Sequence, residues 1–362
     1  MKAHTLLAAA LLGVAASATA ADTPTVNLYI WGEYLAPDTL KRFEAETGIR
    51  VVEDHFDSLE TMETKLLTGR SGYDLVLSAG QHLSRAIEAG AIQPLDKAAL
   101  PHFAGIGEEF RQHMAVFDPG NRYAGIYGWG TTGVGYQQEA VTKRLPAAPL
   151  DSWAMLFDPA VVSKFADCGV SLLNDPNELY AAVMRYLGLD INKQSLADLK
   201  IAQAQLMKIR PYIRYFDNDR NINDLANGDT CVAMSWNGNV GIAAGQAQQA
   251  GKPFSLHYRI PKEGTLIWFD AMVIPKDAPH PAAGLALMDF LMRPDVIAPI
   301  TDTIHYANAI SAADALVDPG IRNDPGTYPP ASVRATLFSK NDNGKEFNRA
   351  LTRAFSSLKA GQ

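Results

Sequence analysis

The first ninety residues alternate short apolar runs with amphipathic stretches, a pattern typical of strands connected by helices. The apolar runs predict three strands, at residues 26–30, 49–53 and 75–77. Between and after them, apolar residues at helical spacing that end at glycine predict helices at residues 37–48, 58–69 and up to Gly90. The resulting βαβαβα order predicts a mostly parallel sheet with helices on its faces.

The rest of the chain continues in the same way. Residues 131–136 are glycine-rich and strand-like, and a helix is predicted at residues 195–210, where Ser195 and Asp198 form a capping-box-like start. Residues 261–275 are again strand-like, and residues 281–292 are helical. We expect a second α/β lobe followed by a return to the first, with two or more crossings forming a hinge.

The length of the chain supports two lobes, because about 340 residues without the leader exceed the usual size of a single core. We predict an α/β fold in which residues 1–20 are a signal peptide. The predicted first lobe comprises residues 24–130 and about 266–310, and the predicted second lobe comprises residues 131–265 and about 311–362.

The end of the chain carries an apolar stripe of Phe347, Leu351, Phe355 and Leu358 at helical spacing. Such a stripe is typical of a packing face and also of an amphipathic helix that lies on a membrane. We favour packing.

The N-terminus has the pattern of an export signal. Lys2 precedes an apolar run that ends in Ala18, Thr19 and Ala20, and such small residues are typical of a cleavage site. The run is too short to span a bilayer. We expect a mature chain that starts at Ala21 and is exported as a soluble protein.

Cys168 and Cys231 are the chain's two cysteines. In an oxidising compartment an even pair most simply forms one disulfide, although two buried free thiols are the alternative. No C-x-x-C motif is present, so the sequence gives little support to a redox role.

The chain is mildly acidic, with a formal net charge of −7 that becomes −8 when Lys2 is removed with the leader. This balance argues against nucleic-acid binding and is compatible with attraction of cations.

Three short motifs place aromatic residues beside a carboxylate or an amide. They are Trp31 with Glu33 and Tyr34, Trp236 with Asn239, and Trp268 with Asp270. A cation is attracted to the face of an aromatic ring, and a nearby carboxylate can hold its ammonium group. The clusters therefore indicate binding of an organic amine.

The order of these and other motifs resembles the periplasmic polyamine-binding proteins of ABC importers, in the branch that binds putrescine and spermidine. The matching motifs cover nearly all of the mature chain and lie at residues 31–38, 69–74, 224–236, 260–264, 268–270, 302–308 and 321–330.

The resemblance implies a two-lobed periplasmic binding fold of type II, which holds a polyamine between its lobes and presents it to the permease in the inner membrane. It also implies a periplasmic monomer with no cofactor. The residues that match ligand contacts of the family are Trp31, Tyr34, Glu178, Trp236, Trp268, Asp270 and Tyr306.

Several positions depart from the family pattern. Gly32 and Ala79 stand where the family usually has serine, Glu33 replaces an aspartate, and Asn239 replaces another aspartate. Loss of a carboxylate that pairs with an ammonium group commonly weakens binding by about a hundredfold. The ligand is therefore expected to be a polyamine, with Glu33 compensating, or an amine whose other end is neutral or acidic. The smaller residues also leave room for a longer amine.

Two other functions stay open: a co-receptor that reports polyamine to a membrane sensor, and a hydrolase that uses Asp270 or Glu178. The glycine-rich segment 130–135 lacks the dinucleotide-binding order, and there is neither a nucleophile elbow nor a P-loop. The histidines show no i, i+4 pairs, and the EF-hand-like start at residue 217 lacks its glycine and glutamate, so no metal site is predicted.

Overall fold

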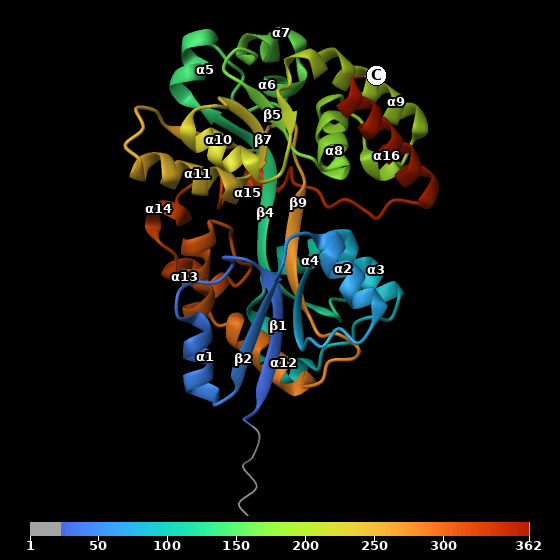
Figure 1. Cartoon of the computed structure of the whole chain (residues 1–362), viewed down its shortest axis with the longest axis vertical. Helices are drawn as coiled ribbons and strands as arrows, with labels where there is room; N and C mark the ends of the chain where they lie inside the picture. The colour runs from blue at the N-terminus through green and yellow to red at the C-terminus, as the bar shows by residue number, and fades with distance from the viewer. Residues whose placement is uncertain (1–22, 362) are drawn as a thin grey trace, which may run out of the picture.

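One mixed sheet runs through both lobes of the molecule (Figure 1). The computed structural model describes residues 23–361, so the predicted signal peptide lies outside the described residues. The strands are β1 (Thr25–Trp31), β2 (Arg50–Phe56), β3 (Leu75–Ala79), β4 (Ala124–Gln137), β5 (Val170–Leu172), β6 (Tyr215–Phe216), β7 (Val232–Trp236), β8 (Leu256–Arg259) and β9 (Ile267–Val273).

Helices cover the sheet in both lobes, and the predicted helix starts at Ser58 and Ser195 are confirmed. The hydroxyl of Ser58 accepts a hydrogen bond from the backbone of Thr61, and that of Ser195 accepts one from the backbone of Asp198. The helices are α1 (Thr39–Thr47), α2 (Leu59–Thr68), α3 (Gly80–Glu88), α4 (Glu108–Met114), α5 (Gln138–Arg144), α6 (Ala154–Phe157), α7 (Pro159–Val162), α8 (Pro176–Tyr186), α9 (Leu196–Ile209), α10 (Arg220–Asn227), α11 (Asn237–Gln249), α12 (Pro281–Leu291), α13 (Pro294–Ile304), α14 (Pro319–Arg322), α15 (Ala331–Arg334) and α16 (Lys345–Ala360).

The strand order is β2-β1-β3-β9-β4-β7-β5-β6, with β8 paired to β4. The pairing is parallel where β1 meets β2 and β3, and where β5 meets β6 and β7. Every antiparallel pair in the described chain involves β4 or β9. The α/β class is confirmed, and the parallel parts of the sheet lie toward its two edges.

Strand β4 connects the two lobes (Figure 1). Its first half pairs with β9, and its second half pairs with β7 and β8. Glycine is required along it, because a Cβ atom at Gly130 would clash with the ring of Trp268 and one at Gly133 with the backbone oxygen of Arg259. The predicted strand at residues 131–136 is thus the second half of a much longer one.

The buried side chains form one large core in each lobe and a third, smaller cluster. The first core includes Phe43 and Phe269, and the second includes Trp153 and Tyr180. The smaller cluster lies between α10, α11 and strands β7 and β8. Leu337 packs in the first core. The predicted lobe boundaries stay predictions.

The C-terminal stripe packs inside the protein, as favoured from the sequence. Phe347, Leu351, Phe355 and Leu358 are buried on α16 and belong to the second core. Across residues 23–361, no helix is both long and apolar enough to cross a membrane.

The predicted disulfide between Cys168 and Cys231 is present. Cys168 lies just before β5 and Cys231 lies just before β7. These two strands are parallel neighbours, and Val170 is paired with Val232. The bond therefore fastens the starts of two neighbouring strands in the second lobe.

Candidate functional site

Most of the candidate residues lie where the chain passes between the lobes. Trp31 ends β1, Trp236 ends β7, and Trp268 and Asp270 lie on β9. The rings of Trp31, Tyr34, Trp236 and Trp268 are half-buried, so part of each ring is free to meet a ligand. The tertiary structure joins the candidate side chains into two groups.

The first group surrounds the carboxylate of Asp270. Tyr34 donates a hydrogen bond from its hydroxyl to this carboxylate, and the side chain of Asp270 is buried. The ring of Tyr306 lies 6.1 Å from that of Tyr34, centroid to centroid. It also packs edge to face against Trp268 at 4.9 Å. An acid enclosed by rings in this way suits an ammonium ion.

The second group surrounds the carboxylate of Glu178 in the first turn of α8. Thr132 Oγ1 donates a hydrogen bond of 2.6 Å to Glu178 Oε2. Trp236 is the register partner of Thr132 across β4 and β7, and it lies close enough to lower the pKa of this carboxyl slightly. The second group thus combines an acid with an aromatic side chain, as the first group does.

Asn239 connects the lobes and has protein partners at both ends of its amide. Tyr306 donates from its hydroxyl to Asn239 Oδ1 at 3.0 Å, and Asn239 Nδ2 donates to the backbone oxygen of Asn218 at 3.1 Å. Asn239 is therefore a neutral residue whose hydrogen bonds hold Tyr306 in place.

Removal from water dominates the electrostatics of both acids. Burial raises the pKa of Asp270 to about 6, although the hydrogen bond from Tyr34 opposes the rise. Burial and the neighbouring carboxylate of Asp175 raise the pKa of Glu178 to about 8, against the hydrogen bond from Thr132 and the smaller effect of Trp236. Both acids would be stabilised in their charged form by a cation between the lobes.

Besides Asn239, two sequence candidates, Trp31 and Glu33, stay outside these two groups. Trp31 packs against Phe56 with ring centroids 4.4 Å apart. Glu33 is exposed with a left-handed backbone (φ 57°), and it lines a surface hollow of about 290 Å³ together with Tyr34, Glu53 and His55. No hydrogen bond or ring contact among residues 23–361 joins Glu33 to Asp270 or Tyr306, and its compensation for Asn239 stays a prediction.

Two further positions that depart from the family pattern lie near the candidate residues. Gly32 is exposed, with open space around the position of a Cβ atom. Ala79 is the register partner of Asp270 across β3 and β9, so it lies beside the first group.

Sequence reasoning missed several residues that support the site. Thr132 holds Glu178, Tyr127 donates from its hydroxyl to the backbone oxygen of Tyr34, and Asp175 caps the helix that carries Glu178. Of these, Thr132 had a visible signal, because it is part of a pair of threonines in an otherwise glycine-rich strand. The others are recognised only through contacts between distant parts of the chain.

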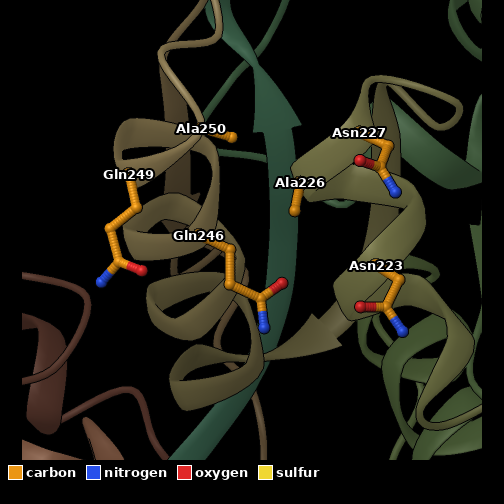
Figure 2. A pocket seen from close by; sticks show the side chains of 6 residues that line it. All are labelled: Asn223, Ala226, Asn227, Gln246, Gln249 and Ala250. Carbon is orange, nitrogen blue, oxygen red and sulfur yellow. The ribbon is translucent and has the colours of Figure 1, made fainter.

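The surface also has a hollow of about 440 Å³ between α10 and α11 (Figure 2). Its polar side chains are the amides of Asn223, Asn227, Gln246 and Gln249. None of the candidate residues lines it, and it offers no charge to an amine. In the described part of the chain, no group of three or more histidine, cysteine or acidic side chains could hold a metal ion.

The raised pKa values predict that binding of a diamine releases protons. At pH 7 a carboxyl with a pKa of about 8 is mostly protonated, and an ammonium ion beside Glu178 lowers this pKa and expels the proton. We expect release of about one proton per putrescine at pH 7 and much less at pH 9. The affinity for putrescine should therefore increase as the pH rises from about 7 to about 9.

The measurement is calorimetric titration at each pH in buffers of different ionisation enthalpy. Equal heats in all buffers at pH 7 would contradict a protonated Glu178 in the ligand-free site. The Glu178→Gln variant provides the control, because it has no proton to lose at this position.

Comparison with known proteins gives consistent results. The profile of the family described as bacterial extracellular solute-binding protein matches residues 38–329. The chain is 42% identical over 360 residues to the putrescine-binding periplasmic protein SpuD of Pseudomonas aeruginosa (strain UCBPP-PA14), covering 99% of this chain and 98% of that protein. It is 43% identical over 359 residues to the putrescine-binding periplasmic protein PotF of Escherichia coli (strain K12), covering 99% and 97%.

A solved structure shows the same fold. The spermidine/putrescine ABC transporter substrate-binding protein PotD of Streptococcus pneumoniae superimposes with a TM-score of 0.81, covering 93% of this chain and 99% of that chain. The two are 24% identical, so this likeness concerns the fold alone.

Proposed function

The chain belongs to the bacterial extracellular solute-binding proteins, and we propose that it captures a polyamine between its lobes and delivers it to an ABC importer. The resemblance inferred from the sequence motifs is confirmed at the level of the family. Putrescine and spermidine are the ligand types named for the relatives. Each carries more than one ammonium group, which suits a site with two acids.

The observation that carries this proposal is the state of the two acids. Asp270 and Glu178 lie among aromatic rings, and removal from water raises the pKa of each. A carboxylate in such a place is costly unless a cation accompanies it. An ammonium ion between the lobes would supply the missing charge, and closure around it would strengthen each ion pair by excluding water.

The relatives also indicate the place of action and the partner. Those named above are periplasmic proteins, which fits the predicted cleavage near Ala20 and the disulfide in the second lobe. The permease of an ABC importer is the proposed partner, and the predicted monomer stays a prediction. The named relatives are binding proteins and not enzymes, so we assign Asp270 and Glu178 the role of counterions.

The test is calorimetric titration of the refolded, ligand-stripped mature protein. The ligands are putrescine, cadaverine, spermidine, spermine, agmatine and 4-aminobutyrate. We expect micromolar or tighter binding of at least one diamine or triamine. If the folded protein binds none of them, the proposal is wrong.

Placing at position 239 the aspartate that is usual in the family tests whether a negative charge there strengthens ligand binding. In Asn239→Asp, Tyr306 can still donate to the side chain, but the hydrogen bond to the backbone oxygen of Asn218 is lost. We expect putrescine to bind about tenfold more tightly, because the new charge attracts an ammonium ion. We also expect the ligand-free protein to be less stable, because a buried carboxylate then faces a carbonyl oxygen.

Calorimetry and thermal unfolding measure the two effects. Asn223→Asp is the control, since it adds the same charge on an exposed position of α10 outside the site. If Asn239→Asp binds no more tightly than this control, the charge at position 239 does not contribute to recognition.

A further inference from the structure

Lys340 is unusual because its charged side chain is buried. It is 8% exposed, and no other lysine or arginine between residues 23 and 361 is buried to this degree. Its Nζ donates to the backbone oxygen of Asn341 and to Asn343 Oδ1, both at 2.9 Å. Buried lysines are rare unless a negative charge accompanies them, so the surroundings of Lys340 need an explanation.

The fold brings Lys340 to the start of α8, next to Glu178. The segment that carries it crosses between the lobes beneath α8 on its way to α16 (Figure 1). Before Lys340, Phe338 exchanges backbone hydrogen bonds with the chain that enters β9. After it, Asn343 Nδ2 donates to Asn177 Oδ1 at 2.8 Å. Asn177 directly precedes Glu178, so both sides of the segment are fixed close to the second group of the site.

Lys340 shares its surroundings with several acids. Burial lowers the pKa of Lys340 to about 8, against the attraction of Asp342, Asp175 and Glu178. Asp342 also lies 3.7 Å from the guanidinium of Arg85, whose closer partner is Glu63. Asp175 caps α8, and the pKa values of Asp175 and Glu178 are both raised. At neutral pH the ammonium ion of Lys340 therefore already faces the acids at the start of α8.

We propose that Lys340 determines ligand specificity. It supplies a positive charge at Glu178, in the place where a second ammonium group of the ligand would otherwise supply one. This inference rests on the proposed function, because it presumes that the ligand's first ammonium group binds at Asp270. The lysine repels a cation that approaches Glu178 and leaves a neutral ligand end unaffected. Lys340 thereby reduces the difference in affinity between a diamine and an amine of the same length whose other end is neutral and forms hydrogen bonds.

Asn239 adds no negative charge that a second ammonium group could use. Its side chain is neutral, and both ends of its amide already have protein partners.

The experiment compares putrescine with N-acetylputrescine in the wild type and in Lys340→Met. Methionine keeps most of the length of the side chain and removes its charge. We expect the ratio of the two association constants, putrescine over N-acetylputrescine, to increase about tenfold in the variant. Putrescine should also raise the melting temperature of Lys340→Met by more than it raises that of the wild type. An unchanged or lower ratio would overturn the proposal.

Two further variants make the comparison specific. Lys345→Met removes the same charge from an exposed position at the start of α16, and it should leave the ratio unchanged. In the Glu178→Gln background, Lys340→Met should change the ratio by less, because the lysine then acts only by direct repulsion and no longer by neutralising Glu178. An equal effect with and without Glu178 would contradict the mechanism.

The wild type alone provides a second test that does not depend on the folding of any variant. At pH 7, putrescine should release about one more proton than N-acetylputrescine, because only the diamine brings a cation to Glu178 and Lys340. Equal release by the two ligands would overturn the proposal. If neither ligand nor any other polyamine binds, the proposed function itself fails. Tight binding with equal proton release would show that the second ammonium group does not reach Glu178, which rejects the role of Lys340 but not polyamine binding.

Discussion

Asp270→Asn should weaken the binding of putrescine by about a hundredfold. Asparagine keeps the shape of the side chain and can still accept the hydrogen bond from Tyr34, so the change removes little besides the charge. Asp270 is buried among the rings of Tyr34, Tyr306 and Trp268, where few water molecules can replace the lost ion pair. Calorimetric titration of the ligand-stripped variant measures the loss.

The same substitution should stabilise the ligand-free protein at pH 7. The pKa of Asp270 is raised to about 6 from an unfolded value near 4, so the folded state binds its proton more tightly than the unfolded state does. Ionisation of Asp270 therefore reduces stability as the pH rises from about 4 to about 6, and the reduction persists above that range. The variant should be more stable than the wild type above pH 6 and similar to it below pH 4.

Asp151→Asn is the matched control, because it removes one carboxylate from a side chain that is 64% exposed in the second lobe. It should change neither affinity nor the pH dependence of unfolding. If Asp270→Asn binds putrescine as tightly as this control, Asp270 is not the acid that holds the ligand. If affinity falls together with stability, the loss reflects damage to the fold.

Removing the disulfide should cause a large loss of stability. The bond between Cys168 and Cys231 closes a loop with a sequence separation of 63, for which the chain-entropy relation gives about 4 kcal/mol. Replacing both cysteines by alanine should therefore lower the free energy of unfolding by about this amount. Urea unfolding of the ligand-free protein at pH 7 measures it.

Reduction of the wild type with dithiothreitol should reproduce the effect, and the double variant should not respond to the reductant. The affinity for putrescine should change little at 25 °C. The disulfide lies at the start of β7, whereas Trp236 of the site lies at its end. An unchanged urea midpoint in the double variant would show that the bond contributes no stability.

In the proposed site, the same two acids would both attract the ligand and bear a cost in its absence. Removal from water disfavours the charged forms of Asp270 and Glu178, and a bound cation would relieve this cost. If Lys340 already supplies part of the relief at Glu178, the two ends of the cleft differ in how strictly they require charge. This asymmetry is the feature by which the protein would distinguish amines of equal length.

Much of the fold follows from local sequence. Helix starts at Ser58 and Ser195 and the buried stripe of α16 depend on residues within a turn or two of each other, so periodicity and capping residues reveal them. Strands β1 to β3 and the helices after them were predicted to within a few residues for the same reason. The motifs also identified the family, because they keep their order along the chain.

Only the tertiary structure decided which side chains meet. Tyr34 and Asp270 are 236 positions apart in the sequence, and Thr132 and Glu178 are 46 apart. Strand β4 contributes to both lobes, and its glycines allow other side chains to pack closely against it. The apolar pattern of this segment does not reveal these close contacts.

The sequence by itself therefore determined the local elements and the family. It also predicted the export signal and the chemical type of the site. The structure alone decided that Glu33 points to the surface while Lys340, an ordinary lysine in the sequence, is buried beside Glu178. The physical reason is that burial and pairing of charges depend on how distant segments pack, whereas the sequence pattern reports only the preferences of neighbouring residues.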